Sequence, residues 1–261
     1  MKKATVLFTN AFVVTMDEKY RLFPEGAVAV KDHQIVAVGE AKALAQDYAD
    51  ADEVIDCGGK VLMPGLINVH THVPMTLLRG LADDLRLDVW LMGYMMPVER
   101  EFVTPEFCKL GTELACAEMI RGGTTTFADM YYFEDVIAEA TKAAGMRAVV
   151  GQSVIKFPTP DSKSYEDGLA LTEALFQKWD NDELIVPAVA PHAPYTCTDE
   201  ILQACADLAV EFDVPLQIHI LETKQEADDS WAEFEKKVVN RVADLGVFRA
   251  KTIAAHCVHV D

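Results

Sequence analysis

Two histidines separated by a single residue, His70 and His72, follow a strongly apolar segment of this chain. Side chains two residues apart on an extended strand point to the same side. Because imidazole is the commonest protein ligand for transition metals, this spacing predicts half of a metal site. A third histidine, His219, lies within the apolar run 216–221. Three histidines that leave one position open are typical of a catalytic zinc site rather than a structural one.

A carboxylate and a further imidazole stand at the ends of two predicted strands. Glu222 follows His219 by three residues and is placed to transfer a proton to and from water at a hydrolytic site. A solvated carboxylate at a helix start, near Lys224, is its simpler interpretation. His256 follows a later apolar segment, and it fits a metal ligand, a general acid or a group that positions the nucleophile.

His192 and Glu99 are two further candidates. His192 lies between Pro191 and Pro194, and a loop made rigid by two prolines predicts a contact with substrate. Glu99 follows a segment rich in methionine, and its pattern alone predicts an exposed residue on a helix.

These residues require a scaffold that brings the ends of strands together. From residue 61 onward, predicted strands alternate with predicted helices, which indicates parallel α/β architecture. Six of the seven histidines fall at strand ends. The active site of a TIM-type barrel lies at the carboxyl ends of its strands. We therefore predict a TIM-type (β/α) barrel domain over residues 61–261, incomplete because about six strand–helix units are expected and the barrel requires eight.

An open, doubly wound sheet is the alternative architecture. No glycine-rich phosphate loop follows a predicted strand, so the sequence favours the barrel. Strands are predicted at residues 61–72, 124–130, 147–155, 184–190, 216–221 and 251–258. Long helices are predicted at residues 88–101 and 226–245, and another begins at Pro105. The expected buried face of this last helix is formed by Phe107, Leu110, Leu114, Ala117 and Ile120.

Residues 1–60 differ from the rest of the chain. Short β-branched and aromatic segments separated by turns predict strands at 5–14, 26–30, 34–38 and 53–56. Lys31-Asp32-His33 predicts the turn of a hairpin, and a short helix is expected at 40–48. Strands this short predict the N-terminal part of a small β-sandwich domain.

The composition excludes some classes of function. The 261 residues include 42 acidic and 23 basic side chains, for a formal charge of −19. A charge of this sign disfavours nucleic-acid binding, which needs a basic surface. No apolar segment reaches the roughly 18 residues that a membrane helix needs. The six cysteines form no Cys-x-x-Cys pair and predict reduced thiols in a cytoplasmic protein.

Several motifs carry a resemblance to a known family. They are the segments Met63–His72, Met75–Asp84, Gly123–Met130, Ala190–Tyr195, Ile218–Thr223 and Thr252–His259. The sequence resembles the amidohydrolase superfamily along its whole length. Within it, the sequence is most similar to the branch of 5-methylthioadenosine/S-adenosylhomocysteine deaminases and chlorohydrolase-like enzymes.

The resemblance implies a metal-dependent hydrolytic deaminase of adenosine-type nucleosides. His70, His72 and His219 would bind one divalent metal ion, most often zinc. Glu222 would transfer the proton and contact the purine ring, while His256 would orient the attacking water. Water would attack C6 of adenine, and ammonia would leave to give the inosine analogue.

The resemblance also implies contacts with a small-molecule substrate and a homo-oligomeric assembly. His192 would contact the purine, Glu99 would hydrogen-bond the ribose hydroxyls, and Trp90 would line the pocket. Two features depart from the family. The aspartate that ends strand eight lies outside this sequence, so we expect a chain that lacks part of the site and belongs to a longer protein. Gln152 stands where an arginine is expected to bind the homocysteine carboxylate.

The substitution at Gln152 bears on the substrate. Lys156 or Lys163 could replace the missing arginine, but the sequence favours 5-methylthioadenosine or adenosine over S-adenosylhomocysteine. Two other functions remain open on the sequence alone. One is another amidohydrolase activity of this branch, as a guanine or cytosine deaminase or an s-triazine chlorohydrolase. The other is a non-catalytic, truncated metal-binding module.

Overall fold

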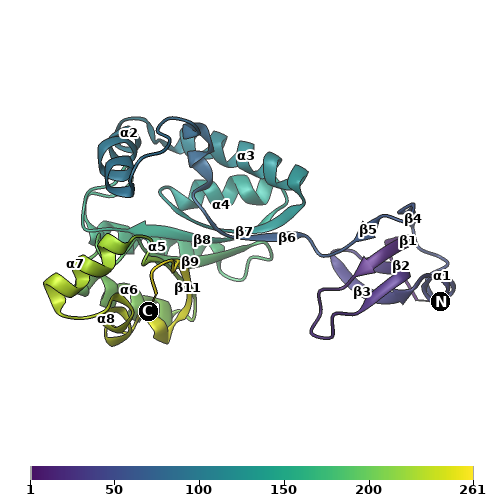
Figure 1. Cartoon of the computed structure of the whole chain (residues 1–261). Helices are drawn as coiled ribbons and strands as arrows, with labels where there is room; N and C mark the ends of the chain where they lie inside the picture. Colours follow the sequence, from purple (N-terminus) through teal and green to yellow (C-terminus); the bar gives the residue numbers. More distant parts are fainter. Residues whose placement is uncertain (1, 261) are drawn as a thin grey trace. The chain divides into compact units, whose positions relative to one another are not determined.

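The computed structural model describes residues 2–260. Its residues form two compact units, one up to Gly65 and one from Leu66 onward. Figure 1 shows the elements of each unit. None of the described helices is long and apolar enough to cross a membrane.

The N-terminal unit contains one sheet and one helix. Its elements are β1 (Val6–Val14), β2 (Leu22–Lys31), β3 (Gln34–Glu40), α1 (Ala41–Asp47), β4 (Glu53–Asp56) and β5 (Val61–Leu62). The strand order is β3-β2-β1-β4, and β5 pairs with β1. The predicted hairpin is confirmed, since Lys31 pairs with Gln34 across the turn and Asp32 adopts a φ of 56°. Leu7, Ala27 and Ala29 pack with Leu44 of α1.

The second unit is built on six parallel strands that lie side by side in chain order. They are β6 (Leu66–Thr71), β7 (Thr124–Tyr131), β8 (Arg147–Val154), β9 (Ile185–Pro191), β10 (Pro215–Ile220) and β11 (Lys251–His256). Sequential parallel strands with intervening helices form the wall of a (β/α) barrel. The predicted incomplete barrel is therefore confirmed (Figure 1).

The helices of this unit are α2 (Met96–Phe102), α3 (Pro105–Gly122), α4 (Glu134–Ala143), α5 (Tyr165–Trp179), α6 (Asp199–Glu211), α7 (Lys224–Phe234) and α8 (Val238–Asp244). Two 3₁₀ helices, η1 (Val73–Leu78) and η3 (Val247–Arg249), and one π-helix, η2 (Val89–Met95), complete it. Buried apolar side chains from the strands and helices form two clusters, one around Phe127 and Val150 and one around Leu216 and Ile218.

Three predicted elements are divided in the structure. The predicted strand 61–72 consists of β5 in the N-terminal unit and β6 in the barrel, with Pro64-Gly65 between them. The predicted helix 88–101 is the π-helix η2 followed by α2, because Pro97 lacks the N–H that a continuous α-helix needs. The predicted helix 226–245 is α7 and α8, separated where Glu235 adopts a left-handed φ of 52°.

The prediction of which residues form the buried face of α3 is wrong. Leu110, Leu114 and Ile120 are exposed, whereas the buried residues are the small side chains Cys108, Gly111, Thr112, Ala115 and Cys116. A Cβ atom at Gly111 would lie 2.6 Å from the carbonyl oxygen of Pro74. The close approach of η1 therefore selects small residues on the inner face of α3.

Candidate active site

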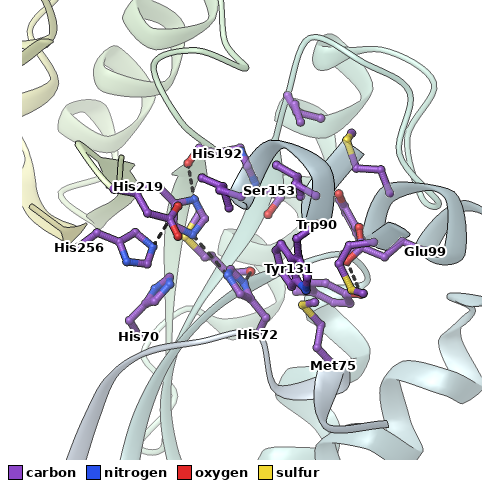
Figure 2. Close-up of a pocket in the computed structure, with 18 of the residues that line it drawn as sticks. His70, His72, Met75, Trp90, Glu99, Tyr131, Ser153, His192, His219 and His256 are labelled. Carbon is purple, nitrogen blue, oxygen red and sulfur yellow. Dashed lines mark hydrogen bonds and ion pairs between the residues drawn. The ribbon is translucent and has the colours of Figure 1, made fainter. Parts of the chain in front are cut away.

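The three predicted metal ligands converge at the carboxyl ends of two strands. His70 lies on β6, His72 follows that strand directly, and His219 lies on β10. Their ring centroids are 4.9–5.2 Å apart, and one nitrogen of each ring lies within 4.8 Å of the others. Figure 2 shows the histidines gathered at one end of a cavity.

The hydrogen bonds of two rings assign their tautomers. Nδ1 of His72 lies 2.6 Å from the carbonyl oxygen of Met130, and Nδ1 of His219 lies 2.7 Å from that of His192. The backbone N–H of His219 donates to the same His192 oxygen at 3.1 Å. Because a carbonyl oxygen only accepts, each Nδ1 carries the proton and each Nε2 presents a bare lone pair.

The two bare nitrogens face each other. Nε2 of His72 and Nε2 of His219 are 3.3 Å apart. Two lone pairs at this distance repel unless a cation lies beside both, and metal-binding histidines ordinarily donate the other ring N–H to a carbonyl oxygen. The three imidazoles therefore fit a transition-metal ion.

Burial keeps these imidazoles neutral. It lowers the pKa of His70 to about 4, and it also lowers the pKa of His72 and His219. Metal binding requires the neutral imidazole, so at neutral pH no proton competes for the free nitrogens.

Glu222 and His256 lie beside the histidine cluster. Oε2 of Glu222, in the loop after β10, is 3.6 Å from Nε2 of His256 at the end of β11. The His256 ring centroid is 5.1 Å from that of His70. Leu221 and His256 adopt left-handed φ angles of 52° and 73°, which are unfavourable for these side chains. The backbone is thus strained next to Glu222, the predicted proton-transfer residue, and at His256, which was predicted to orient the attacking water.

His192 presents an acceptor nitrogen to the same cavity. Its Nδ1 lies 2.8 Å from the hydroxyl oxygen of Thr196, and that hydroxyl donates its proton to the carbonyl oxygen of Ala193 at 3.2 Å. Nδ1 of His192 must therefore donate, which leaves Nε2 as an acceptor. Burial lowers the pKa of His192 to about 3, so the ring stays neutral.

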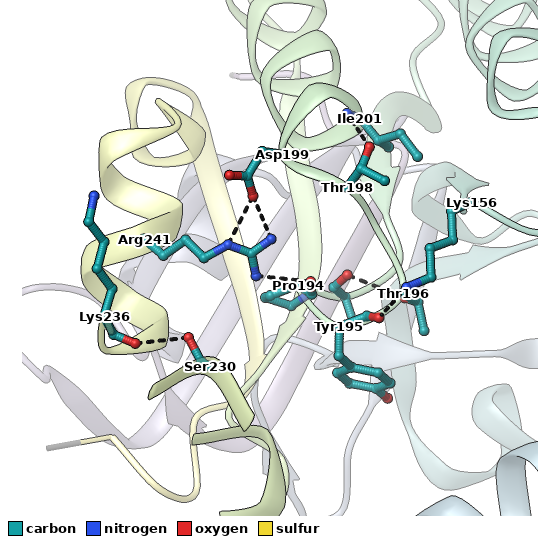
Figure 3. Close-up of polar contacts among 11 residues, drawn as sticks. Lys156, Pro194, Tyr195, Thr196, Thr198, Asp199, Ile201, Ser230, Lys236 and Arg241 are labelled. Carbon is teal, nitrogen blue, oxygen red and sulfur yellow. Dashed lines mark hydrogen bonds and ion pairs between the residues drawn. The ribbon is translucent and has the colours of Figure 1, made fainter. Parts of the chain in front are cut away.

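The loop that carries His192 is held by two cations. Nη1 of the buried Arg241 donates to the carbonyl oxygen of Pro194 at 3.2 Å, and its Nε donates to Asp199 at 2.9 Å. Nζ of Lys156 donates to the carbonyl oxygen of Tyr195 at 3.0 Å. Figure 3 shows these contacts around the loop. They hold the backbone that follows His192 in the loop, while the bond to Thr196 orients the imidazole itself.

The cavity has a volume of about 190 Å³ and two chemically different ends. The histidines form one end, while Trp90, Glu99 and Met75 lie at the other (Figure 2). Glu222 belongs to the histidine end, since it lies beside His256. Apolar and thioether side chains from Met75, Leu87, Trp90, Leu91, Met95, Met96, Met130 and Ile155 form much of the lining. Among residues 2–260, no lysine or arginine lines it.

Glu99 lies in the cavity wall, although its sequence pattern predicted an exposed helix residue. Its side chain on α2 is buried, and the Tyr131 hydroxyl donates to its Oε1 at 2.8 Å. Burial raises the pKa of Glu99 to about 7. The π-helix η2, which precedes α2, places Trp90 in the same wall.

Gln152 and the two candidate lysines lie outside the lining. Gln152 is buried, and its Nε2 donates to Oδ2 of Asp161 at 2.8 Å. The ammonium group of Lys156 donates to the carbonyl oxygen of Tyr195, and Lys163 is exposed and is not among the lining residues. None of the three therefore provides a positive charge for a substrate carboxylate.

Sequence reasoning gave no role to a buried carboxyl pair beneath the histidines. Oδ1 of Asp129 accepts from the Thr71 hydroxyl at 2.6 Å and from the Val73 N–H at 2.7 Å, the two residues that flank His72. Glu134 accepts from the Tyr131 N–H. Burial raises the pKa of Asp129 to about 7 and that of Glu134 well above its ordinary value. A carboxylate between the apolar residues Phe127, Ala128 and Met130 of β7 was the available signal.

A sequence profile of the amidohydrolase family matches residues 61–261. The chain belongs to the amidohydrolase family. The predicted family is therefore confirmed, and the cluster of imidazoles in this amidohydrolase supports a bound metal ion.

Two relatives of this amidohydrolase are 5-methylthioadenosine/S-adenosylhomocysteine deaminases. The protein of that name from Syntrophobacter fumaroxidans is 47% identical over 259 residues, which are 99% of this chain and 59% of the relative. That from Thermodesulfovibrio yellowstonii is 43% identical over 258 residues, 98% of this chain and 59% of the relative. The chain thus spans about three fifths of the length of these relatives.

Solved structures share the fold of this amidohydrolase. An adenosine deaminase from Xanthomonas campestris with bound Zn has a TM-score of 0.95 and 40% identity, covering 100% of this chain and 59% of that one. A guanine deaminase from C. acetobutylicum has a TM-score of 0.84 and 22% identity, covering 98% of this chain and 61% of that one. The second likeness shows the fold alone.

Proposed function

We propose that the complete protein is a metal-dependent hydrolytic deaminase of adenosine-type nucleosides that prefers 5-methylthioadenosine and adenosine to S-adenosylhomocysteine. The observation that carries the proposal is the convergence of two bare imidazole nitrogens, 3.3 Å apart, with Glu222 in the lining of one cavity. The names of the deaminase relatives support the same reaction.

His70, His72 and His219 would hold one divalent ion, and three nitrogen donors suit zinc. The Zn-bound adenosine deaminase from Xanthomonas campestris supports this choice. Such an ion, when bound, supplies Lewis-acid activation of water.

The side chains of the cavity would transfer the proton, orient the water and bind the substrate. Glu222 takes a proton from the attacking water and delivers it to the purine ring, and His256, 3.6 Å away, orients the water. Nε2 of His192 accepts from the exocyclic amino group. Water adds at C6, and the remaining proton of the added hydroxyl passes to the amino nitrogen. The bond from C6 to that nitrogen then breaks, and the products are the inosine analogue, with a carbonyl at C6, and ammonia. Trp90 and the methionines exclude bulk water.

The lining favours a neutral substituent on the ribose. A thioether methyl group suits the contacts that methionine and tryptophan side chains offer. The carboxylate of S-adenosylhomocysteine would find no cation among the described lining residues, and Glu99, at the ribose end of the cavity, would repel it. We therefore infer a preference for 5-methylthioadenosine and adenosine.

Ammonia release by the zinc-loaded protein from the complete reading frame tests this function. We expect turnover of 5-methylthioadenosine and adenosine, with kcat/KM for S-adenosylhomocysteine lower by about tenfold or more. Absence of turnover with every 6-aminopurine nucleoside would overturn the proposal. Turnover of guanine, cytosine or an s-triazine instead would assign another activity of the branch, and zinc binding without any turnover would assign a metal-binding module.

Three further expectations remain predictions. They are the division into a sandwich part at residues 1–60 and a barrel part at 61–261, a cytoplasmic location, and a homo-oligomeric state.

Glu99→Gln is expected to raise KM about tenfold while kcat changes little, because a hydrogen bond from the ribose to a charged acceptor is lost. Since burial raises the pKa of Glu99 to about 7, the carboxylate is lost as the pH falls through 7. KM of the unsubstituted protein should therefore rise below pH 7, whereas KM of the variant should stay level. Steady-state kinetics between pH 6 and 8 measure both.

The matched control for this experiment is Glu101→Gln, because Glu101 is exposed on the same helix. Its kinetics should equal those of the unsubstituted protein. A Glu99→Gln variant that keeps the same KM and the same pH dependence would contradict the assigned contact.

A further inference from the structure

A second carboxylate, that of Glu226, lies buried beneath the loop that carries Glu222. Glu226 is in the first turn of α7 and is 6% exposed. Its Oε2 accepts from the backbone N–H of Glu222 at 3.2 Å. Its Oε1 is buried and has no hydrogen-bond partner among the residues that the structure describes. Burying a carboxylate oxygen without a hydrogen-bond partner costs free energy of folding, so the position of Glu226 requires an explanation.

Helix capping accounts for only part of this arrangement. Thr223 is the N-cap of α7, and its hydroxyl oxygen accepts from the Glu226 N–H at 3.4 Å. In an ordinary capping box, the glutamate would return this bond to the N–H of the capping residue itself. Here the carboxylate bonds one residue earlier, to Glu222, and therefore acts on the loop rather than on the helix end alone.

The peptide group between Leu221 and Glu222 is held on both sides. Its carbonyl oxygen, on Leu221, accepts from the N–H groups of Val258 at 3.0 Å and His259 at 3.1 Å. Its N–H, on Glu222, donates to Glu226. Leu221 has a left-handed φ of 52°, which a leucine avoids unless surrounding contacts hold it. The orientation of this peptide group determines the direction in which the Glu222 side chain leaves the backbone.

We propose that Glu226 is a positioning residue for the reaction, because its buried carboxylate fixes the peptide group from which Glu222 reaches into the active site. The proposal rests on the proton-transfer role proposed for Glu222. Backbone N–H groups in the loop after β11 bind the carbonyl oxygen of this peptide group. Among the contacts described, Glu226 is the one side chain that binds its N–H.

Substitution of Glu226 in the zinc-loaded protein from the complete reading frame tests the proposal. Glu226→Ala is expected to lower kcat about 10- to 100-fold with KM nearly unchanged, because a small misplacement of a reacting group has an effect of this size. Glu226→Gln keeps an acceptor oxygen and should restore kcat to near the original value. Glu233→Ala removes an exposed carboxylate from the same helix and should have no effect. Zinc content should be equal in all three variants.

Glu226→Asp provides a second test with a variant that should not destabilise the fold. It keeps a negative charge in the first turn of α7, where the helix dipole favours it, but it is one carbon shorter. We expect it to remain folded and to lower kcat as Glu226→Ala does, because its carboxylate is too short to reach the Glu222 N–H.

A double-mutant cycle separates positioning from plain helix stability. In a Glu222→Gln background, Glu226→Ala should cause no further loss of kcat, because no carboxylate remains to be positioned. A loss that is the same in both backgrounds, or a lower unfolding midpoint with unchanged kcat, would overturn the proposal. If Glu222→Gln itself keeps full activity, the proton-transfer role of Glu222 fails, whereas absence of turnover by the unsubstituted protein would overturn the proposed function. If Glu222→Gln is inactive and Glu226→Ala is fully active, only the positioning role fails.

Discussion

Glu222→Gln is expected to lower kcat about a thousandfold while the metal stays bound. Glutamine has nearly the same shape as glutamate, and the backbone N–H of residue 222 can still donate to Glu226. What the substitution removes is the group that accepts a proton from water and returns it to the ring. The prediction is checked by ammonia release together with elemental analysis of the purified protein.

The control for this experiment is Glu211→Gln, because Glu211 is an exposed carboxylate at the end of α6. It should change neither zinc content nor kcat. A Glu222→Gln variant with full activity would show that another group transfers the proton. A variant that loses its zinc would show instead that Glu222 helps to hold the ion.

His219→Ala is expected to weaken zinc binding by more than about 100-fold and to leave no measurable activity. The substitution removes one of three nitrogen donors and leaves His72 without the neighbouring Nε2 at 3.3 Å. Competition with a coloured zinc chelator at pH 7 measures the affinity directly. This readout does not depend on the identity of the substrate.

His33→Ala is the matched control, since His33 is an exposed histidine in the turn between β2 and β3. Its zinc affinity should be that of the unsubstituted protein. If His219→Ala kept the same affinity, the ion would have to lie elsewhere, and the site built on His70 and His72 would be wrong.

The sequence predicts the histidine cluster well because the rules involved are geometric. Alternation along a strand brings His70 and His72 to one side, and a parallel barrel brings its strand ends together. His219, on a strand that is not adjacent to β6, could therefore be placed beside them from the sequence.

The inner face of α3 could not be predicted from hydrophobicity. Leu110 and Leu114 are more apolar than Gly111, yet Gly111 faces the core. The deciding factor is the distance to Pro74, a residue on another element. Helical periodicity carries no information about such distances.

The surroundings of Glu99 and Gln152 could not be predicted for a related reason. Glu99 is buried because α2, together with the π-helix before it, forms one wall of the cavity. Gln152 bonds to Asp161 on a loop nine residues away. In both cases the tertiary arrangement of neighbouring segments, rather than a local sequence pattern, determines what the side chain contacts.

The carbonyl oxygen of His192 accepts both the backbone N–H and the ring Nδ1–H of His219. A residue proposed to bind substrate and a residue proposed to hold the ion therefore depend on the same peptide group. Mutations that reshape this loop to admit a new base would also disturb His219 and so weaken binding of the ion. Selection should therefore preserve the loop. We expect substrate range to diversify instead at Trp90, Leu91 and Met95 of η2, a segment that none of the described hydrogen bonds joins to the histidine cluster.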